Sequence, residues 1–223
     1  NKGVRLYELG NVYLPKSLPL TELPEEKMTF TLGMYDDGDF YDMKGVVEDF
    51  FDKAGMHKKA EYDPKAGKPF LHPGRQAEIR YEGEVMGYLG EVHPAVAANY
   101  GIGTRAYLAV LDIPAVVEKA SFDRKYTGIA KYPAVNRDIS MVVPKQILAG
   151  DIEHMIEQRG GKILEHCSLF DIYEGSQIQE GYKSMAYSIV FRSAEKTLEE
   201  AEVSAAMKKI LNGLESLGIQ LRQ

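Results

Sequence analysis

Two short motifs carry the side chains best suited to acid–base chemistry. His72 and Arg75 stand in a His-Pro-Gly-Arg loop, and Glu91 and His93 stand in a Gly-Glu-Val-His-Pro segment. A small hydrolase could use His72 and His93 as acid and base, provided that a nucleophile or carboxylate lies within hydrogen-bond reach. The structural alternative, which we favour, is a turn shaped by the proline and glycine in which Arg75 pairs with a nearby carboxylate.

These two motifs do not predict a bound metal ion, and a glycine-rich run further along the chain does not predict a bound phosphate group. Glu91 and His93 project from the same side of a strand, but zinc usually takes at least three protein ligands. The glycine-rich run from Gly101 to Arg105 precedes a strand, whereas a phosphate cradle joins a strand to the N-terminus of a helix. We therefore expect no metal ion and no cofactor in this chain.

A different set of polar residues lies on two strands expected near the C-terminus. Asp171 and Tyr173 end one strand with the same parity as each other. The polar and small residues that alternate with the apolar stripe of the next strand are Tyr182, Ser184, Ala186, Ser188 and Arg192. Tyrosine rings can stack on unpaired bases, while serine and aspartate can address their hydrogen-bonding edges. A plain solvated sheet face has the same pattern, so the residues alone leave both interpretations open.

The composition narrows the class of protein. The chain has 223 residues, 44% of them hydrophobic and 27% charged, and no apolar run long enough to span a membrane. The net charge of −6 argues against a general nucleic-acid binder, but it permits a local contact that reads bases. Cys167 is the only cysteine, which excludes an internal disulfide and favours a reducing compartment, the cytoplasm. Because strand-like alternation starts immediately after Asn1, we interpret the chain as a piece of a longer polypeptide.

Residues 1–118 predict an α+β domain built on an antiparallel sheet. Alternation in residues 4–14 around a Gly-Asn pair predicts a hairpin, and a strand follows at 28–34. Asp42 is the expected N-cap of a helix that ends at Gly55. Beyond it we expect strands at 77–81 and 85–89, a helix at 94–99, a strand at 107–113 and a linker at 119–129.

Residues 130–223 alternate strands and helices in the order β-α-β-β-α-β, which is the ferredoxin-like arrangement. In that arrangement both helices cover one face of the sheet and leave the other face open. Thr197 and Glu200 form an expected capping box at the start of the second helix. The expected elements are a strand at 139–143, a helix at 152–160, strands at 163–173 and 185–191, a helix at 197–217 and a strand at 219–222.

Several separated motifs resemble one known family. The second domain carries KYPAVNRDISMVV, LFDIYEG, GYKSMAYSIVFR, KTLEEAEV and GIQLR. This series is similar to the ferredoxin-fold anticodon-binding domain of bacterial phenylalanine–tRNA ligase beta subunits. The first domain carries RLYELGNVY, DFYDMKGVVEDFF, HPGRQAEI and GYLGEVHP, which resemble the end of the catalytic-like domain that precedes it in that family. The resemblance covers essentially the whole chain in the family's order.

The resemblance implies a function that the residues alone do not establish. In this family the alpha subunit activates phenylalanine with ATP and Mg²⁺ and transfers it to tRNA(Phe) in an α₂β₂ tetramer. The synthetase-like fold of the beta subunit is non-catalytic, so the resemblance implies no catalytic residue here and no membrane partner. By motif position, the anticodon contacts fall on Asp171, Tyr173, Ser184 and Arg222. A ferredoxin-like sensor of small molecules and the hydrolase described above are the alternatives.

Overall fold

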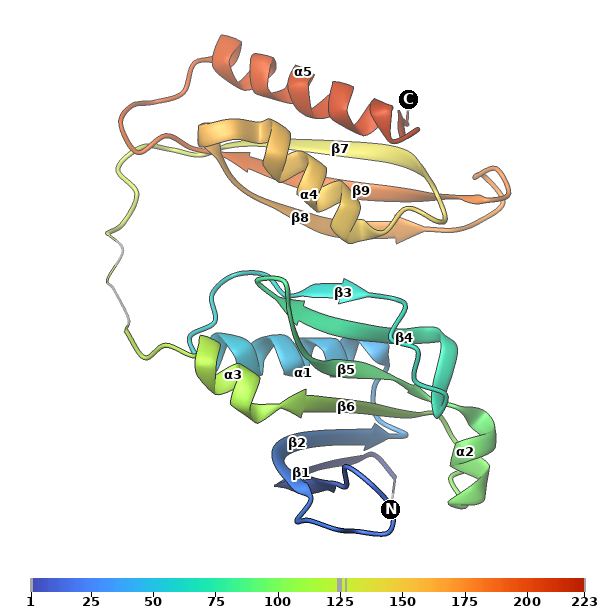
Figure 1. Ribbon diagram of the computed structural model, residues 1–223. Coiled ribbons are helices and arrows are strands. Elements are labelled where there is room, and N and C mark those ends of the chain that lie inside the picture. The colour runs from blue at the N-terminus through green and yellow to red at the C-terminus, as the bar shows by residue number, and fades with distance from the viewer. Residues whose placement is uncertain (1, 124–125, 127, 223) are drawn as a thin grey trace. The chain divides into compact units, whose positions relative to one another are not determined.

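The computed structural model describes residues 2–123, 126 and 128–222 and divides into two compact units, residues 1–126 and 127–223 (Figure 1). Each unit has its own antiparallel sheet and its own hydrophobic core. This mixed α+β architecture is the predicted fold class. Within the described residues, no helix is long and apolar enough to cross a membrane.

The first unit is a six-stranded antiparallel sheet with helices packed on one face. Its elements are β1 (Val4–Leu14), β2 (Glu25–Tyr35), α1 (Phe40–Lys53), β3 (Glu61–Asp63), β4 (Leu71–Tyr81), β5 (Glu84–Val92), α2 (Pro94–Asn99), β6 (Ala106–Asp112) and α3 (Ile113–Lys119). The strand order is β1-β2-β6-β5-β4-β3. Met43, Val47 and Phe51 of α1 are buried with Val116 of α3 against the apolar side chains of the sheet. The helix α3 was missed from sequence, where the pattern breaks at Pro114.

Two local predictions for this unit are wrong. No hairpin forms within residues 4–14, because β1 is one continuous strand that pairs with β2 along its whole length. The N-cap of α1 is Asp39 rather than Asp42. The Asp39 carboxylate accepts hydrogen bonds from the backbone N–H groups of Tyr41 and Asp42, and Asp42 accepts one in return from the backbone of Asp39. This reciprocal capping box starts the helix at Phe40, three residues earlier than expected.

The second unit is a four-stranded antiparallel sheet with two helices on one face (Figure 1). Its elements are β7 (Val135–Pro144), α4 (Ala149–Gly160), the 3₁₀ turn η1 (Gly161–Ile163), β8 (Leu164–Tyr173), β9 (Tyr182–Phe191), α5 (Glu200–Ser216) and β10 (Gln220–Leu221). The strand order β10-β7-β9-β8 follows the predicted β-α-β-β-α-β succession. The N-cap of α5 is Glu199, in a capping box with Glu202, so the box predicted at Thr197 and Glu200 is displaced.

Gly55, which follows the last turn of α1, lies against the backbone of Ser121, and mutation can test this close contact. Gly55 has φ +79°, and a Cβ at this position would lie 1.6 Å from the carbonyl oxygen of Ser121. We expect Gly55→Ala to lower the free energy of unfolding by more than about 2 kcal/mol, because strain and steric overlap add. The control is Gly45→Ala in the middle of α1, where an added Cβ meets nothing within 4 Å. That change should stabilise by about 0.5–1 kcal/mol.

Urea unfolding, followed by circular dichroism, measures the free energy of unfolding of both variants. Similar stability changes for the two alanines would contradict the close approach of Ser121 to the end of α1.

Candidate nucleic-acid interface

The four-stranded sheet has two different faces. The face covered by α4 and α5 buries alternate residues of the central strands, which are Ile139, Met141, Val143, Met185, Tyr187, Ile189 and Phe191. The opposite face, called the open face below, carries Ser140, Asp171, Tyr173, Ser184, Ala186 and Ser188. Cross-strand pairing sets Tyr173 opposite Ser184 and Asp171 opposite Ala186. The register therefore gathers residues of three strands on a face without a helix (Figure 1).

A one-residue bulge in β8 brings Asp171 and Tyr173 to the open face. Leu169 pairs with Tyr187 on the helix-covered face, whereas Asp171 pairs with Ala186 on the open face. The residue between them, Phe170, has no pairing partner in the ladder, so two residues of β8 stand against one of β9. Without this extra residue, strict alternation would place Asp171 on the same face as Leu169. Sequence analysis found the shared parity of Asp171 and Tyr173 but not the bulge.

Two of the four predicted anticodon-contact residues, Ser184 and Arg222, meet at one end of the open face. One guanidinium nitrogen of Arg222 donates a hydrogen bond to the Ser184 hydroxyl at 3.4 Å, and the other donates to the side-chain carbonyl of Gln177 at 3.4 Å. The backbone N–H of Arg222 donates to the carbonyl of Ser140 at 2.8 Å, which fixes the end of the chain against β7. Ser184 is only 4% exposed, so its hydroxyl acts mainly as a support for Arg222.

Asp171 and Tyr173 remain accessible beside this cluster. Tyr173 is 38% exposed and lies directly opposite Ser184. Asp171 is exposed, and within the described residues no hydrogen bond or ion pair engages its carboxylate. The arrangement presents an aromatic ring, a free carboxylate and a guanidinium on one surface. Such a surface can stack on a planar group and exchange hydrogen bonds with its edge.

A glycine in the following loop shapes the position of the tyrosine. A Cβ on Gly175 would lie 2.2 Å from the hydroxyl oxygen of Tyr173, so only glycine leaves room for the ring as it lies. Gly175 and Gln177 were both missed by sequence reasoning. Their contacts join a loop to residues on a strand and at the chain end, and such contacts have no local signal in the sequence.

The charges around the open face are mixed rather than basic. Lys145 and Glu174 form an ion pair at 2.7 Å, and the hydrogen bond and charge of Lys145 lower the pKa of the Glu174 carboxyl. Lys183 pairs with the core residue Val143 on the helix-covered face, where it donates to the carbonyl of Ile147 at 3.0 Å and burial lowers the pKa of its ammonium group. Lys145 is thus already engaged by Glu174, whereas Arg222 contacts Ser184 directly.

Arg192, which alternation placed with the polar residues of β9, is not part of the cluster. Its guanidinium pairs with Glu165 at 2.8 Å and donates to the carbonyl of Tyr132 at 2.8 Å. It therefore ties β9 to the neighbouring strand and to the segment before β7.

The histidine and arginine motifs of the first unit have structural roles. Arg75 contacts both carboxylate oxygens of Glu91, at 3.0 and 2.9 Å, as the structural alternative predicted. Nδ1 of His72 accepts from the backbone N–H of Gly74 at 3.1 Å, in a segment that belongs to β4 rather than to a loop. Nδ1 of His93 caps α2 by accepting a backbone hydrogen bond at 3.2 Å. Among the described residues, no group of three His, Cys, Asp or Glu side chains is placed to hold a metal ion.

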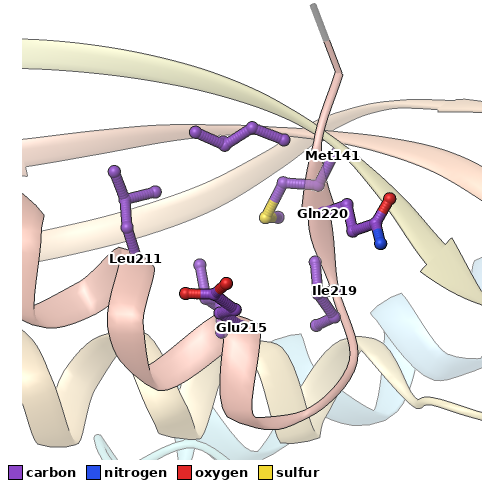
Figure 2. A pocket seen from close by; sticks show the side chains of 7 residues that line it. Met141, Leu211, Glu215, Ile219 and Gln220 are labelled. Carbon is purple, nitrogen blue, oxygen red and sulfur yellow. The ribbon is translucent and has the colours of Figure 1, made fainter.

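A shallow hollow lies on the helix side of the same sheet, away from the open face. Figure 2 shows Leu211 and Glu215 of α5 facing Met141 and Ile219 across it. Its lining is mainly aliphatic and includes one carboxylate. It lacks the combination of aromatic ring, carboxylate and guanidinium that the open face presents.

Comparison with known proteins agrees with this geometry. Residues 130–222 match the family model described as the ferredoxin-fold anticodon binding domain. Residues 1–113 match the model described as the phenylalanyl tRNA synthetase beta chain CLM domain. The second unit thus matches the ferredoxin-fold anticodon-binding domain family, and the first unit matches the CLM domain family. The chain belongs to the phenylalanyl tRNA synthetase beta chain family.

Curated relatives support the same assignment. The chain is 42% identical to the phenylalanine–tRNA ligase beta subunit of Clostridium tetani and 40% identical to that of Clostridium acetobutylicum, over 100% of this chain in both cases. It is 36% identical to the Bacillus subtilis beta subunit over 96% of this chain. In each alignment the chain spans 28% of the relative's own length.

Among solved structures, pyrrolysyl-tRNA synthetase from Desulfitobacterium hafniense superimposes with a TM-score of 0.39 and 12% identity, over 52% of this chain and 41% of that chain. This similarity is too remote to support an argument.

The pairing of Arg75 with Glu91 makes a testable contribution to stability. The Glu91 side chain is 4% exposed and the Arg75 side chain is 44% exposed. We expect Arg75→Met to lower the free energy of unfolding by roughly 2–3 kcal/mol, because it leaves a buried carboxylate without its partner. The control is Arg5→Met, whose pair with Asp37 is 55% and 47% exposed. That change should cost at most about 1 kcal/mol. Equal losses in urea unfolding would contradict a scaffold role for Arg75.

Proposed function

We propose that this chain is part of a phenylalanine–tRNA ligase and that its open face recognises the anticodon of tRNA(Phe). The observation that supports the proposal most strongly is the joint presentation of Asp171, Tyr173 and Arg222 on a sheet face without a helix. Single-stranded RNA loops are recognised in this way, by aromatic stacking combined with hydrogen bonds to base edges. The whole enzyme joins phenylalanine to tRNA with ATP, and this chain contributes recognition rather than bond making.

Each side chain has a distinct proposed role. Tyr173 stacks on one unpaired anticodon base, and the Asp171 carboxylate accepts hydrogen bonds from N–H groups on a base edge. Arg222 donates to a base or to a neighbouring phosphate. Ser184, at 4% exposure, positions the Arg222 guanidinium and adds a direct base contact only if that side chain swings away.

The acidic net charge fits a division of labour within a larger assembly. A chain with net charge −6 supplies few phosphate contacts, and these contacts normally provide most of the affinity for nucleic acid. We infer that other parts of an α₂β₂ tetramer hold the tRNA backbone while the open face reads bases. We also propose a cytoplasmic location, which a role on tRNA and a single, buried cysteine support.

We further propose that the first unit is a non-catalytic scaffold that packs against the alpha subunit, where ATP and Mg²⁺ would bind. Its histidines and Arg75 are engaged in backbone and ion-pair contacts within the unit. β1 and the loop after it expose large apolar side chains, which are Leu6, Tyr7, Leu9, Tyr13, Leu18, Leu20 and Leu23. An exposed apolar surface of this kind is typical of a face that another protein surface covers.

The decisive experiment compares phenylalanine tRNA with the same tRNA carrying a scrambled anticodon. Fluorescence anisotropy measures their dissociation constants at two salt concentrations, with these residues in a full-length beta subunit assembled with its alpha subunit. We expect the scrambled tRNA to bind more weakly at both salt concentrations, because base contacts are lost and phosphate contacts are kept. Equal binding that fades with salt would show phosphate contact alone and would contradict anticodon reading.

Truncating the proposed stacking residue tests its role directly. Tyr173→Ala should weaken binding of phenylalanine tRNA about 5- to 150-fold, which corresponds to the roughly 1–3 kcal/mol that a stacked base contributes. The matched control is Tyr100→Ala, which removes a tyrosine that is 79% exposed in the first unit and should leave the affinity unchanged. An unchanged dissociation constant for Tyr173→Ala would refute the stacking role.

A further inference from the structure

The bulged residue of β8 is a large aromatic side chain left in solvent. Phe170 is 60% exposed on the edge strand β8, whereas Tyr187 and Phe191, the aromatic residues of β9 on the helix-covered face, are fully buried. A bulge needs an extra backbone residue but does not need an aromatic side chain at that place. The core therefore gives no reason for a phenylalanine at position 170.

The position of Phe170 connects it with the open face. The bulge sets both Phe170 and Asp171 against Ala186, a residue of the open face. Tyr173 follows two residues after Asp171 on the same face, about 6.6–6.8 Å further along the strand. The free carboxylate of Asp171 thus lies between two aromatic rings along one strand.

β8 is also open to approach from the side. It is the last strand in the order β10-β7-β9-β8, so one edge of it pairs with no other strand of the sheet. An extended single strand of RNA can run along this edge and place successive bases over the face. The hydrophobic side chain at position 170 offers a π-face to a base of any type, because stacking tolerates all bases.

We propose that Phe170 is a second stacking residue of the interface and that it holds an unpaired nucleobase next to the base stacked on Tyr173. The inference rests on the proposed function and deepens it. Asp171, between the two rings, then lies within reach of the edges of both bases. Because two neighbouring unpaired bases are recognised rather than one, the bound RNA is a loop whose bases are turned outward.

A double-mutant cycle between protein and RNA tests this assignment in the assembled enzyme. The protein variants are Phe170→Ala, Phe170→Tyr, Tyr173→Ala and the control Ile172→Ala, which removes a neighbouring side chain that is 48% exposed on the helix side of the strand. The RNA variants are phenylalanine tRNAs with a single abasic nucleotide at each position of the anticodon loop. Anisotropy gives each dissociation constant, and melting temperatures of the protein variants verify that the fold is intact.

The expected result is a 5- to 150-fold loss of affinity for Phe170→Ala, with affinity kept in Phe170→Tyr and Ile172→Ala. One abasic position should weaken the binding of tRNA to the parent enzyme but cause no further loss of affinity in Phe170→Ala. A different abasic position should behave in this way in Tyr173→Ala. If Tyr173→Ala weakens binding while Phe170→Ala is additive with every abasic position, the second stacking site is refuted and anticodon recognition stands. If neither variant nor a scrambled anticodon changes the affinity, both proposals fail.

Discussion

The alternation of side chains along a strand is the constraint on which the second unit depends. Residues of β7 and β9 that face the helices must be apolar, and their neighbours are thereby turned to the open face. β8 follows the same rule from His166 to Leu169 and would bury Asp171 with the core if the alternation continued unbroken. The extra residue at Phe170 reverses the parity, so an acidic and an aromatic side chain reach the surface without a polar group entering the core.

The connections of the unit explain why one face stays free of helices. β7 and β8 are both antiparallel to β9, and β9 and β10 are both antiparallel to β7, so each helix joins two parallel strands. Parallel crossovers are almost always right-handed. The two crossovers start in opposite directions and move toward opposite edges of the sheet, which brings α4 and α5 to the same face. The polar face is thus a consequence of topology as much as of composition.

The parts of this fold that could be predicted from sequence are those set by repeating local patterns. The period-two stripe from Met185 to Phe191 and the apolar spacing of α5 located the strand and the helix. The β8 bulge at Phe170 could not be predicted, because a single added residue leaves no mark in the composition and shifts the alternation at one point only. The burial of Ser184 under Arg222 also escaped prediction, since these residues are 38 positions apart and meet only when β10 closes the sheet. The N-cap of α1 also escaped prediction, because the backbone contacts that make Asp39 rather than Asp42 the cap cannot be seen in the sequence.

Arginine side chains have different surroundings in the two units. In the first unit, Arg75 is bound by a buried carboxylate, which makes a rigid scaffold and leaves the guanidinium little freedom to serve a ligand. In the second unit, Arg222 makes two long hydrogen bonds of 3.4 Å to neutral oxygen atoms. Exchanging such neutral acceptors for the anionic oxygens of a phosphate gives a stronger interaction, because both partners are then charged. The difference in partner, rather than in residue type, makes the first arginine structural and lets the second exchange its partners, as its proposed role in recognition requires.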